Sequence, residues 1–176
     1  MRITLIFIFS LLTLISCNND EDENFENNNE IILFSEQARV VGYLPTWRFA
    51  LTDKIDFCKL THINIAFGNP TVDGTIQLSN QSAISSLEQL INTAKSQNSS
   101  IKFYISLAGG VLSTQVADTW KNFLANSQDR PKLIDKIIEF VLENKLDGVD
   151  VDLEWTHVTN GYSDFVIELK QEPVSY

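Results

Sequence analysis

Short apolar runs alternate with helix-spaced apolar positions along most of the chain. Four runs have the length and composition of strands, at residues 39–44, 60–67, 101–107 and 146–153. Apolar side chains recurring every three or four residues predict helices over residues 82–95, 116–125, 131–144 and 162–170. Ser82 is the expected N-cap of the first helix, and Pro131 suits the first turn of the third.

The order of these elements predicts an α/β fold. Strands separated by crossover helices form parallel sheets, and such crossovers are overwhelmingly right-handed. Residues 45–56 are expected to form a loop, and Asn69-Pro70 and Asp73-Gly74 are turn signals between residues 68 and 80. The pattern alone leaves open whether the sheet is open or closed.

The first sixteen residues have the pattern of a signal peptide. Arg2 is followed by the apolar run 3–15, which is shorter than the roughly 20 residues of a membrane-spanning helix. The run ends in Leu14-Ile15-Ser16-Cys17, which resembles a bacterial lipobox, so we expect lipidation of Cys17. The alternative is an ordinary cleaved signal followed by an incidental cysteine. We therefore expect an exported protein, held by its lipid on the bacterial outer membrane or cell surface.

Residues 17–37 are expected to form an acidic, Asn-rich tether before a single domain over residues 38–176. Residues 18–30 read NNDEDENFENNNE, a composition that buries too little apolar surface to fold. The whole chain has 176 residues, 44% of them hydrophobic, and a formal net charge of −10. An acidic protein without a basic patch is a poor candidate for nucleic-acid binding, whereas a neutral sugar polymer meets no such objection.

The two cysteines exclude several kinds of site. If Cys17 is lipidated, Cys58 is left alone and is expected to be a buried small apolar residue. Neither histidine, His62 or His157, is placed to activate a thiol, and the count excludes a Cys/His zinc site. We expect no cofactor and no resident metal.

The predicted fourth strand carries three carboxylates at alternating positions. Asp150, Asp152 and Glu154 therefore share one face, while Val149, Val151 and Leu153 occupy the other. Carboxylates packed together without a nearby cation repel one another, which raises the pKa of at least one of them and suits acid/base chemistry. The alternatives are an exposed acidic face, a chance motif and a magnesium or calcium site, of which the metal site is the strongest.

Residues 147–154, DGVDVDLE, match the Asp-x-x-Asp-x-Asp-x-Glu signature of glycoside hydrolase family 18, and Gly148 and Trp155 also fit the pattern. Three further segments resemble the earlier strands of that family in the right order, at residues 41–47, 60–67 and 104–110. The last of these normally reads Ser-x-Gly-Gly and includes Ser106, Gly109 and Gly110, but Ala108 replaces its first glycine. The resemblance covers residues 39–170.

The resemblance implies a (β/α)₈ barrel and a retaining mechanism in which the substrate's own acetamido group is the nucleophile. Glu154 would be the catalytic acid, Asp152 would orient the acetamido group, and Asp150 would share a proton with Asp152. Asp147, out of phase with these three, would be structural. Ser106 would support the Asp150–Asp152 pair.

Three aromatic residues near predicted strand ends could stack on sugar rings, because the face of a pyranose is apolar. They are Tyr43, Trp47 and Trp155. Each could equally pack under a loop.

The chain is short for the family. A (β/α)₈ barrel needs about 250 residues and eight strands, whereas four strands are predicted here. The resemblance implies that a Tyr-Asp pair on the sixth strand and a Trp on the eighth are missing. We expect a truncated chain; pairing of the half barrel with a second copy is the alternative.

The resemblance implies endo-acting hydrolysis of chitin, the β-1,4-linked polymer of N-acetylglucosamine. The alternatives are an endo-β-N-acetylglucosaminidase acting on N-glycan cores and an inactive glycan-binding fragment. The intact Glu154 argues against the last of these, and the missing half argues partly for it.

Overall fold

The computed structural model of this protein describes residues 38–154 and 160–172. The predicted signal peptide, the tether, Cys17 and Trp155 lie outside the described residues. Within those two ranges, no helix is long and apolar enough to span a bilayer.

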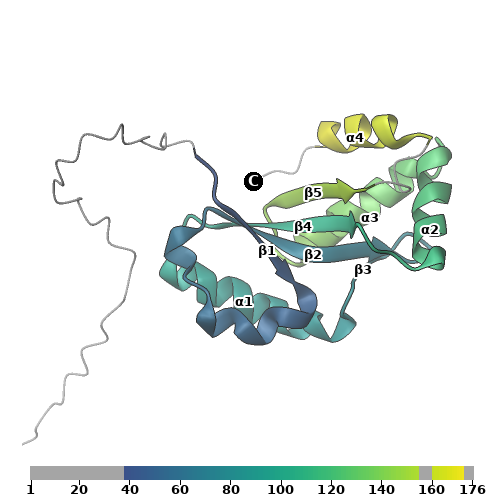
Figure 1. Ribbon diagram of the computed structural model, residues 1–176. Coiled ribbons are helices and arrows are strands. Elements are labelled where there is room, and N and C mark those ends of the chain that lie inside the picture. Colours follow the sequence, from purple (N-terminus) through teal and green to yellow (C-terminus); the bar gives the residue numbers. More distant parts are fainter. Residues whose placement is uncertain (1–37, 155–159, 173–176) are drawn as a thin grey trace, which may run out of the picture.

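The centre of the fold is a parallel sheet whose strands run in the order β1-β2-β4-β5 (Figure 1). Their bounds are Val41–Pro45 for β1, His62–Pro70 for β2, Lys102–Gly109 for β4 and Gly148–Leu153 for β5. A short strand, β3 (Ile76–Leu78), pairs antiparallel with the end of β2. The parallel strands connected by helices confirm the predicted α/β class.

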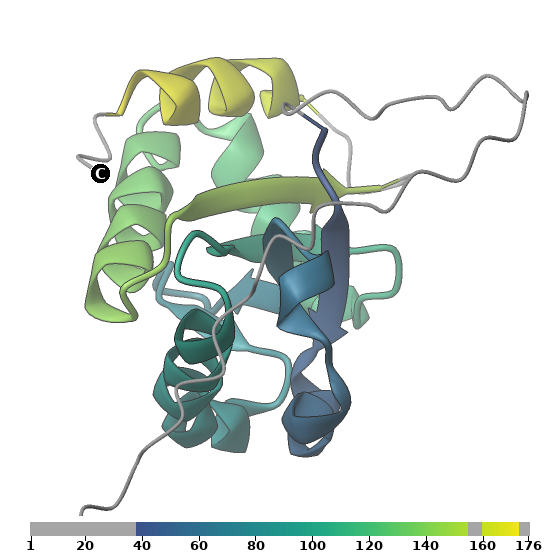
Figure 2. The same cartoon turned by 90° about the vertical axis from the view of Figure 1, so that its left-hand side faces the viewer.

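Four α-helices follow the strands. They are α1 (Ile84–Gln97), α2 (Thr114–Ala125), α3 (Arg130–Glu143) and α4 (Tyr162–Gln171). In two views at right angles, α1 lies beside the β1–β2 half of the sheet, and α3 and α4 lie beside β5 (Figures 1 and 2). Three 3₁₀ helices complete the described fold: η1 (Thr46–Lys54), η2 (Phe57–Lys59) and η3 (Gln81–Ala83).

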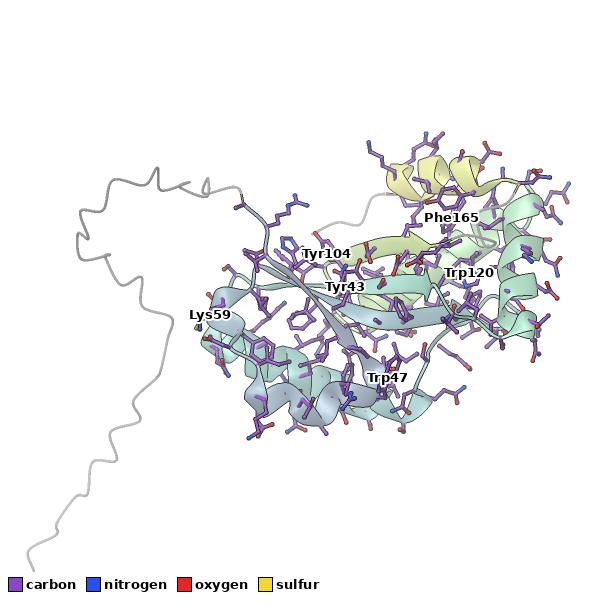
Figure 3. The ribbon with its side chains drawn as sticks, in the orientation of Figure 1. Tyr43, Trp47, Lys59, Tyr104, Trp120 and Phe165 are labelled. Atoms are coloured by element: carbon purple, nitrogen blue, oxygen red, sulfur yellow. The ribbon has the colours of Figure 1, made fainter. Side chains whose placement is uncertain are left out.

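Alternation along the strands separates an apolar face from a polar face. Ile63 and Ile65 of β2 and Phe103 and Ile105 of β4 are buried in the core against the helices. Trp120 of α2 and Phe165 of α4 meet edge to face there, with ring centroids 6.2 Å apart (Figure 3). The intervening positions of the strands face the other way, and they carry the polar residues of the candidate site.

Local sequence signals explain several helix boundaries. Ser113 caps α2, because its side chain accepts a hydrogen bond from the backbone N–H of Val116 at 3.3 Å. Pro131 lies in the first turn of α3, as predicted. Gly161 precedes α4 with φ 81°, and a Cβ there would lie 1.8 Å from the carbonyl oxygen of Leu124, so glycine alone fits.

Several local predictions are wrong. The expected loop at residues 45–56 contains η1, and β3 lies within the segment predicted to consist of turns. Ser82 belongs to η3 and does not cap α1, whose N-cap position is Ala83. Cys58 in η2 is exposed, because its neighbour Phe57 takes the buried position.

Candidate active site

The three carboxylates of the predicted acidic strand extend from the middle of β5 to the residue that follows it. Asp150 and Asp152 lie on the face of the sheet opposite the core, and Glu154 is the first residue beyond the strand. Val151 and Leu153 pack on the apolar side. The carboxylates therefore lie at the carboxyl ends of the parallel strands, where α/β enzymes place their catalytic groups.

Asp150 is held by two hydroxyl groups, one from the adjacent strand β4 and one from β1. Ser106 is fully buried beside it in the sheet, and its Oγ donates a hydrogen bond to Asp150 Oδ2 at 2.7 Å. Tyr43 Oη donates to the same oxygen at 2.9 Å. Because both O–H groups converge on Oδ2, that oxygen serves as a hydrogen-bond acceptor and is fixed in position.

Asp152 is the member of the row whose pKa is shifted. Its pKa is raised above the ordinary value by burial first, then by the charges of Glu154 and Asp150, and finally by a hydrogen bond with Glu154. Each of these causes disfavours the ionised form. Asp152 therefore retains its proton to a higher pH than an isolated aspartate does.

Two consecutive glycines make room for this row. Gly109 has φ 82°, and a Cβ at this position would lie 2.8 Å from the ring of Phe67. A Cβ on Gly110 would lie 2.8 Å from Oε2 of Glu154. The backbone of the loop after β4 can therefore pass directly against the acid only because Gly110 has no side chain.

Ala108, where the resembling motif has glycine, adopts a left-handed backbone conformation with φ 71°. Such a conformation costs an L-residue roughly 1–2 kcal/mol relative to its usual regions. The side chain is buried at 1% exposure, directly opposite Asp152 in the β4–β5 register. The departure from the motif is thus accommodated at the cost of backbone strain beside the site.

Asp147 lies at the other end of β5, away from the carboxylate row. Its Oδ1 pairs with Lys102 Nζ at 2.9 Å, and its Oδ2 accepts the backbone N–H of Phe103 at 2.9 Å. Both partners belong to the start of β4. Asp147 therefore links the beginnings of two strands.

The predicted sugar-stacking residues differ in position. Tyr43 on β1 is 52% exposed and lies over the sheet, whereas Trp47 in η1 is 57% exposed and lies beyond the end of β1 (Figure 3). Trp155 lies outside the described residues. Of the two described members of this group, Tyr43 contacts the acidic row through its hydroxyl group.

Two features of the site were missed from the sequence. Tyr43 was predicted only to stack on a sugar ring, yet its hydroxyl group donates a hydrogen bond to Asp150. The pKa of Tyr43 is raised first by the burial of part of the side chain and then by that hydrogen bond. Asn64, opposite Tyr43 in the β1–β2 register, is 4% exposed, and its Oδ1 is the one buried side-chain polar atom of the described residues without a partner. The position of Asn64 follows from the β1–β2 register, whereas the Tyr43–Asp150 contact joins two strands that do not pair in the described sheet, so neither could be read from one strand.

Within the described residues, no group of three or more His, Cys, Asp or Glu side chains is arranged to hold a metal ion. The carboxylates instead form hydrogen bonds with hydroxyl groups and with one another.

The sequence model of glycosyl hydrolases family 18 matches residues 39–174. The chain belongs to this family. The match spans the carboxylate row, the two glycines and all the described strands.

Two curated relatives are similar to part of the chain. A secreted chitinase, LysM12, from Penicillium expansum is 29% identical over 153 residues, which are 75% of this chain and 10% of that protein. A chitinase-like effector from Moniliophthora perniciosa is 29% identical over 114 residues, or 63% of this chain and 25% of that protein. The chain thus matches a minor part of each relative's length.

Solved structures confirm the barrel fold. The family 18 chitinase ChiB from the chitin utilization locus of Flavobacterium johnsoniae is 46% identical, with a TM-score of 0.71, and the match covers 76% of this chain and 41% of ChiB. A family 18 chitinase from Cycas revoluta in complex with (GlcNAc)₃ is 22% identical, with a TM-score of 0.65, over 75% of this chain and 40% of that one. The described sheet therefore has the fold of part of a (β/α)₈ barrel.

Proposed function

We propose that this chain carries the acid/base site of an endo-acting hydrolase that cleaves β-1,4-linked N-acetylglucosamine polymers with retention of configuration. The observation that best supports this proposal is the ordered row of carboxylates. Asp150 accepts hydrogen bonds from two hydroxyl groups, Asp152 has a raised pKa, and Gly110 leaves room for Glu154. Family membership supports a glycosidase, and the 46% identical ChiB supports chitin as the substrate.

In the first proposed step, Glu154 gives its proton to the glycosidic oxygen as that oxygen leaves the anomeric carbon. The carbonyl oxygen of the substrate's 2-acetamido group bonds to the same carbon, which forms an oxazolinium ion. Asp152 lies two residues before Glu154, where it can accept a hydrogen bond from the acetamido N–H and stabilise the developing positive charge.

In the second step, the Glu154 carboxylate takes a proton from water, and the resulting hydroxide bonds to the anomeric carbon. The oxazolinium ring opens, the acetamido group is restored, and Glu154 is again protonated. Two displacements at one carbon retain its configuration. Asp150, fixed through Oδ2, exchanges a proton with Asp152 as the charge on the ring develops and decays.

A chimera tests this proposal within a complete barrel. Residues 38–172 of this chain replace the corresponding segment of the F. johnsoniae ChiB, and release of a chromophore from an N-acetylglucosamine oligomer is measured. We expect turnover that falls about 10²–10⁴-fold in Glu154→Gln, the usual contribution of a general acid. Glu139→Gln, which alters an exposed carboxylate on α3, serves as the control. Equal turnover in the chimera and its Glu154→Gln variant would refute the assignment.

An endo-β-N-acetylglucosaminidase acting on N-glycan cores would use the same acetamido-assisted chemistry. Digesting chitin oligomers and a high-mannose glycopeptide in parallel separates the two functions. We expect the chimera to cleave the oligomers preferentially. An inactive glycan-binding fragment would bind them and release no product.

We further propose that the protein is exported and anchored through a lipid on Cys17. The secreted relative from P. expansum supports export, and the resemblance of residues 14–17 to a lipobox supports the anchor. Labelling with a radioactive fatty acid should mark the wild-type chain and not Cys17→Ser. Equal labelling of both would contradict the anchor.

A further inference from the structure

Asn64 of β2 is a buried polar residue whose side chain has no part in the proposed reaction. It is 4% exposed, and its Oδ1 accepts no hydrogen bond from the described residues. Leaving a buried amide oxygen without a donor costs free energy, and an apolar side chain of similar size would avoid that cost. A buried polar atom of this kind calls for an explanation in the chemistry around it.

The strand register places Asn64 one layer below the carboxylate row. Asn64 is paired with Tyr43 of β1 on one side and with Tyr104 of β4 on the other. Two positions further along β4, Ser106 is paired with Asp150. Because side chains alternate along a strand, Asn64 lies on the same face of the sheet as Asp150, nearer to the start of the strands.

Tyr43 connects Asn64 to the carboxylate row. Its Oη donates its one proton to Asp150 Oδ2 at 2.9 Å, so a hydrogen bond between Tyr43 and Asn64 uses the Tyr43 oxygen as the acceptor. The pKa of Tyr43 agrees with this: burial raises it first and the bond with Asp150 raises it further, whereas a side-chain hydrogen bond with Asn64 lowers it. A hydrogen bond that lowers the pKa of a phenol comes from a donor, which stabilises the phenolate. The side-chain N–H of Asn64 therefore points at the Tyr43 oxygen.

We propose that Asn64 is a positioning residue of the carboxylate row. Its N–H occupies one lone pair of the Tyr43 oxygen, so the Tyr43 O–H is directed at Asp150 Oδ2. A hydroxyl group that accepts one hydrogen bond while it donates another is also a stronger donor, because the two bonds polarise each other. Asp150 thereby keeps its donor, and the proton shared by the pair is held on Asp152. The inference rests on the proposed function, since it gives Asn64 a part in the same reaction.

The titratable side chains on this face of the described sheet come from all four parallel strands. They are Tyr43 of β1, His62 of β2, Lys102 and Tyr104 of β4, and Asp150 and Asp152 of β5, followed by Glu154. His62 and Lys102 are paired with each other at the start of the strands, two layers below Asp150. Because Asn64 is uncharged, its replacement by leucine leaves all of these charges in place, and its effect on the carboxylate pair is transmitted through Tyr43.

The first test measures kcat/KM of the chimera for a chromogenic N-acetylglucosamine oligomer as a function of pH. Asn64→Leu removes the N–H donor at similar volume, so the Asp150–Asp152 pair loses part of the stabilisation of its charge and takes up a second proton at a higher pH. The acidic limb of the profile, which reports that proton uptake, should therefore move up by about half a pH unit. Tyr43→Phe removes the hydrogen bond to Asp150 itself and should move the limb up by about one unit.

The two substitutions combined distinguish a positioning role from a purely structural one. If Asn64 acts through the Tyr43 hydroxyl group, the double variant should have the acidic limb of Tyr43→Phe alone. Asn64→Leu should also leave the free energy of unfolding of the chimera unchanged or raise it, because a buried oxygen without a donor is removed. Asn92→Leu, at an exposed position on α1, is the control and should change neither measurement. An unmoved limb in Asn64→Leu, or a further shift in the double variant, would overturn the inference.

A second measurement does not depend on turnover and so separates this inference from the proposed function. The ¹³C signals of the Asp150 and Asp152 carboxyl groups are followed by NMR during a pH titration of the chimera. We expect the lower midpoint of the pair to lie about half a pH unit higher in Asn64→Leu than in the wild-type sequence. A higher midpoint in a chimera without hydrolysis would support the positioning of the pair and count against the proposed function. An equal midpoint would overturn the positioning role, whether or not the chimera is active.

Discussion

Gly110 determines how closely the main chain approaches Glu154. The Cβ of an alanine there would lie 2.8 Å from Oε2, closer than real Cβ contacts come, and would push the carboxylate away. We expect Gly110→Ala to lower the kcat of the chimera about 10²-fold, since a displacement of about 1 Å can cost that much. Gly42→Ala is the matched control, because its Cβ would meet only the side chains of Ile63 and Leu60 at 3.5 Å. Full activity of Gly110→Ala would contradict the claim that this glycine fixes the position of the Glu154 carboxylate.

Asp152 links the chemistry of the site to the stability of the fold. Its pKa in the folded chain is raised above the ordinary value. The stabilisation from its protonated form is therefore complete below pH 3.8 and is lost as the pH rises through the raised value. Above that pH, the ionised carboxylate destabilises the fold.

Asp152→Asn should therefore raise the free energy of unfolding at pH 7 and lose this advantage as the pH falls below 4, about the ordinary value for aspartate. Urea unfolding of the chimera at both pH values, where the sheet lies within a complete barrel, measures the difference. Asp135→Asn on the exposed side of α3 controls for the loss of a negative charge. A variant that is less stable than the wild type at pH 7 would contradict the raised pKa.

At the scale of elements, Asp147 joins the start of β5 to the start of β4. Its carboxylate accepts a backbone N–H of Phe103 and pairs with Lys102, and its side chain is 13% exposed. Asp147→Ala should lower the free energy of unfolding by about 1–3 kcal/mol, because the Phe103 N–H loses its acceptor. Chemical denaturation of the chimera, with Asp135→Ala as the control, measures this change. An unchanged free energy of unfolding would mean that the two strands are held in register by other contacts.

The helices and strands with regularly spaced apolar residues could be predicted from the sequence, and those without such spacing were missed. The apolar stripe from Leu133 to Val141 located α3 to within one residue at each end. Strand β3 has three residues beside two turn signals, and η1 has no regular apolar spacing, so neither left a periodic signal. The acidic face of β5 followed from alternation alone, whereas the contact between Tyr43 and Asp150 joins residues 107 positions apart on two strands that do not pair, so it depends on the tertiary arrangement of the sheet.

At the scale of the whole molecule, the described sheet has two edges and one open face. In the described part of the chain, β1 and β5 each pair with a single neighbour, and the β1 side exposes Val41 at 45% and Tyr43 at 52%. Unpaired edges and exposed apolar residues favour association between chains. The (β/α)₈ barrels to which this sheet is similar are longer, since the match covers 41% of ChiB.

The chain on its own is therefore expected to self-associate and to show no hydrolysis of a chromogenic N-acetylglucosamine oligomer. Size-exclusion chromatography with light scattering should show a mass that rises with concentration. A monodisperse monomer whose turnover disappears in Glu154→Gln would contradict this expectation and would show that this chain is sufficient for catalysis.

The central claim is that the strand ending at Glu154 is a retaining, substrate-assisted site. The most direct measurement is the anomeric configuration of the first product released from a chitin oligomer by the chimera, followed by ¹H NMR before mutarotation. The account predicts a β-anomer, together with no cleavage of the matching oligomer without acetyl groups. An α-anomer, or equal cleavage of the deacetylated oligomer, would contradict it.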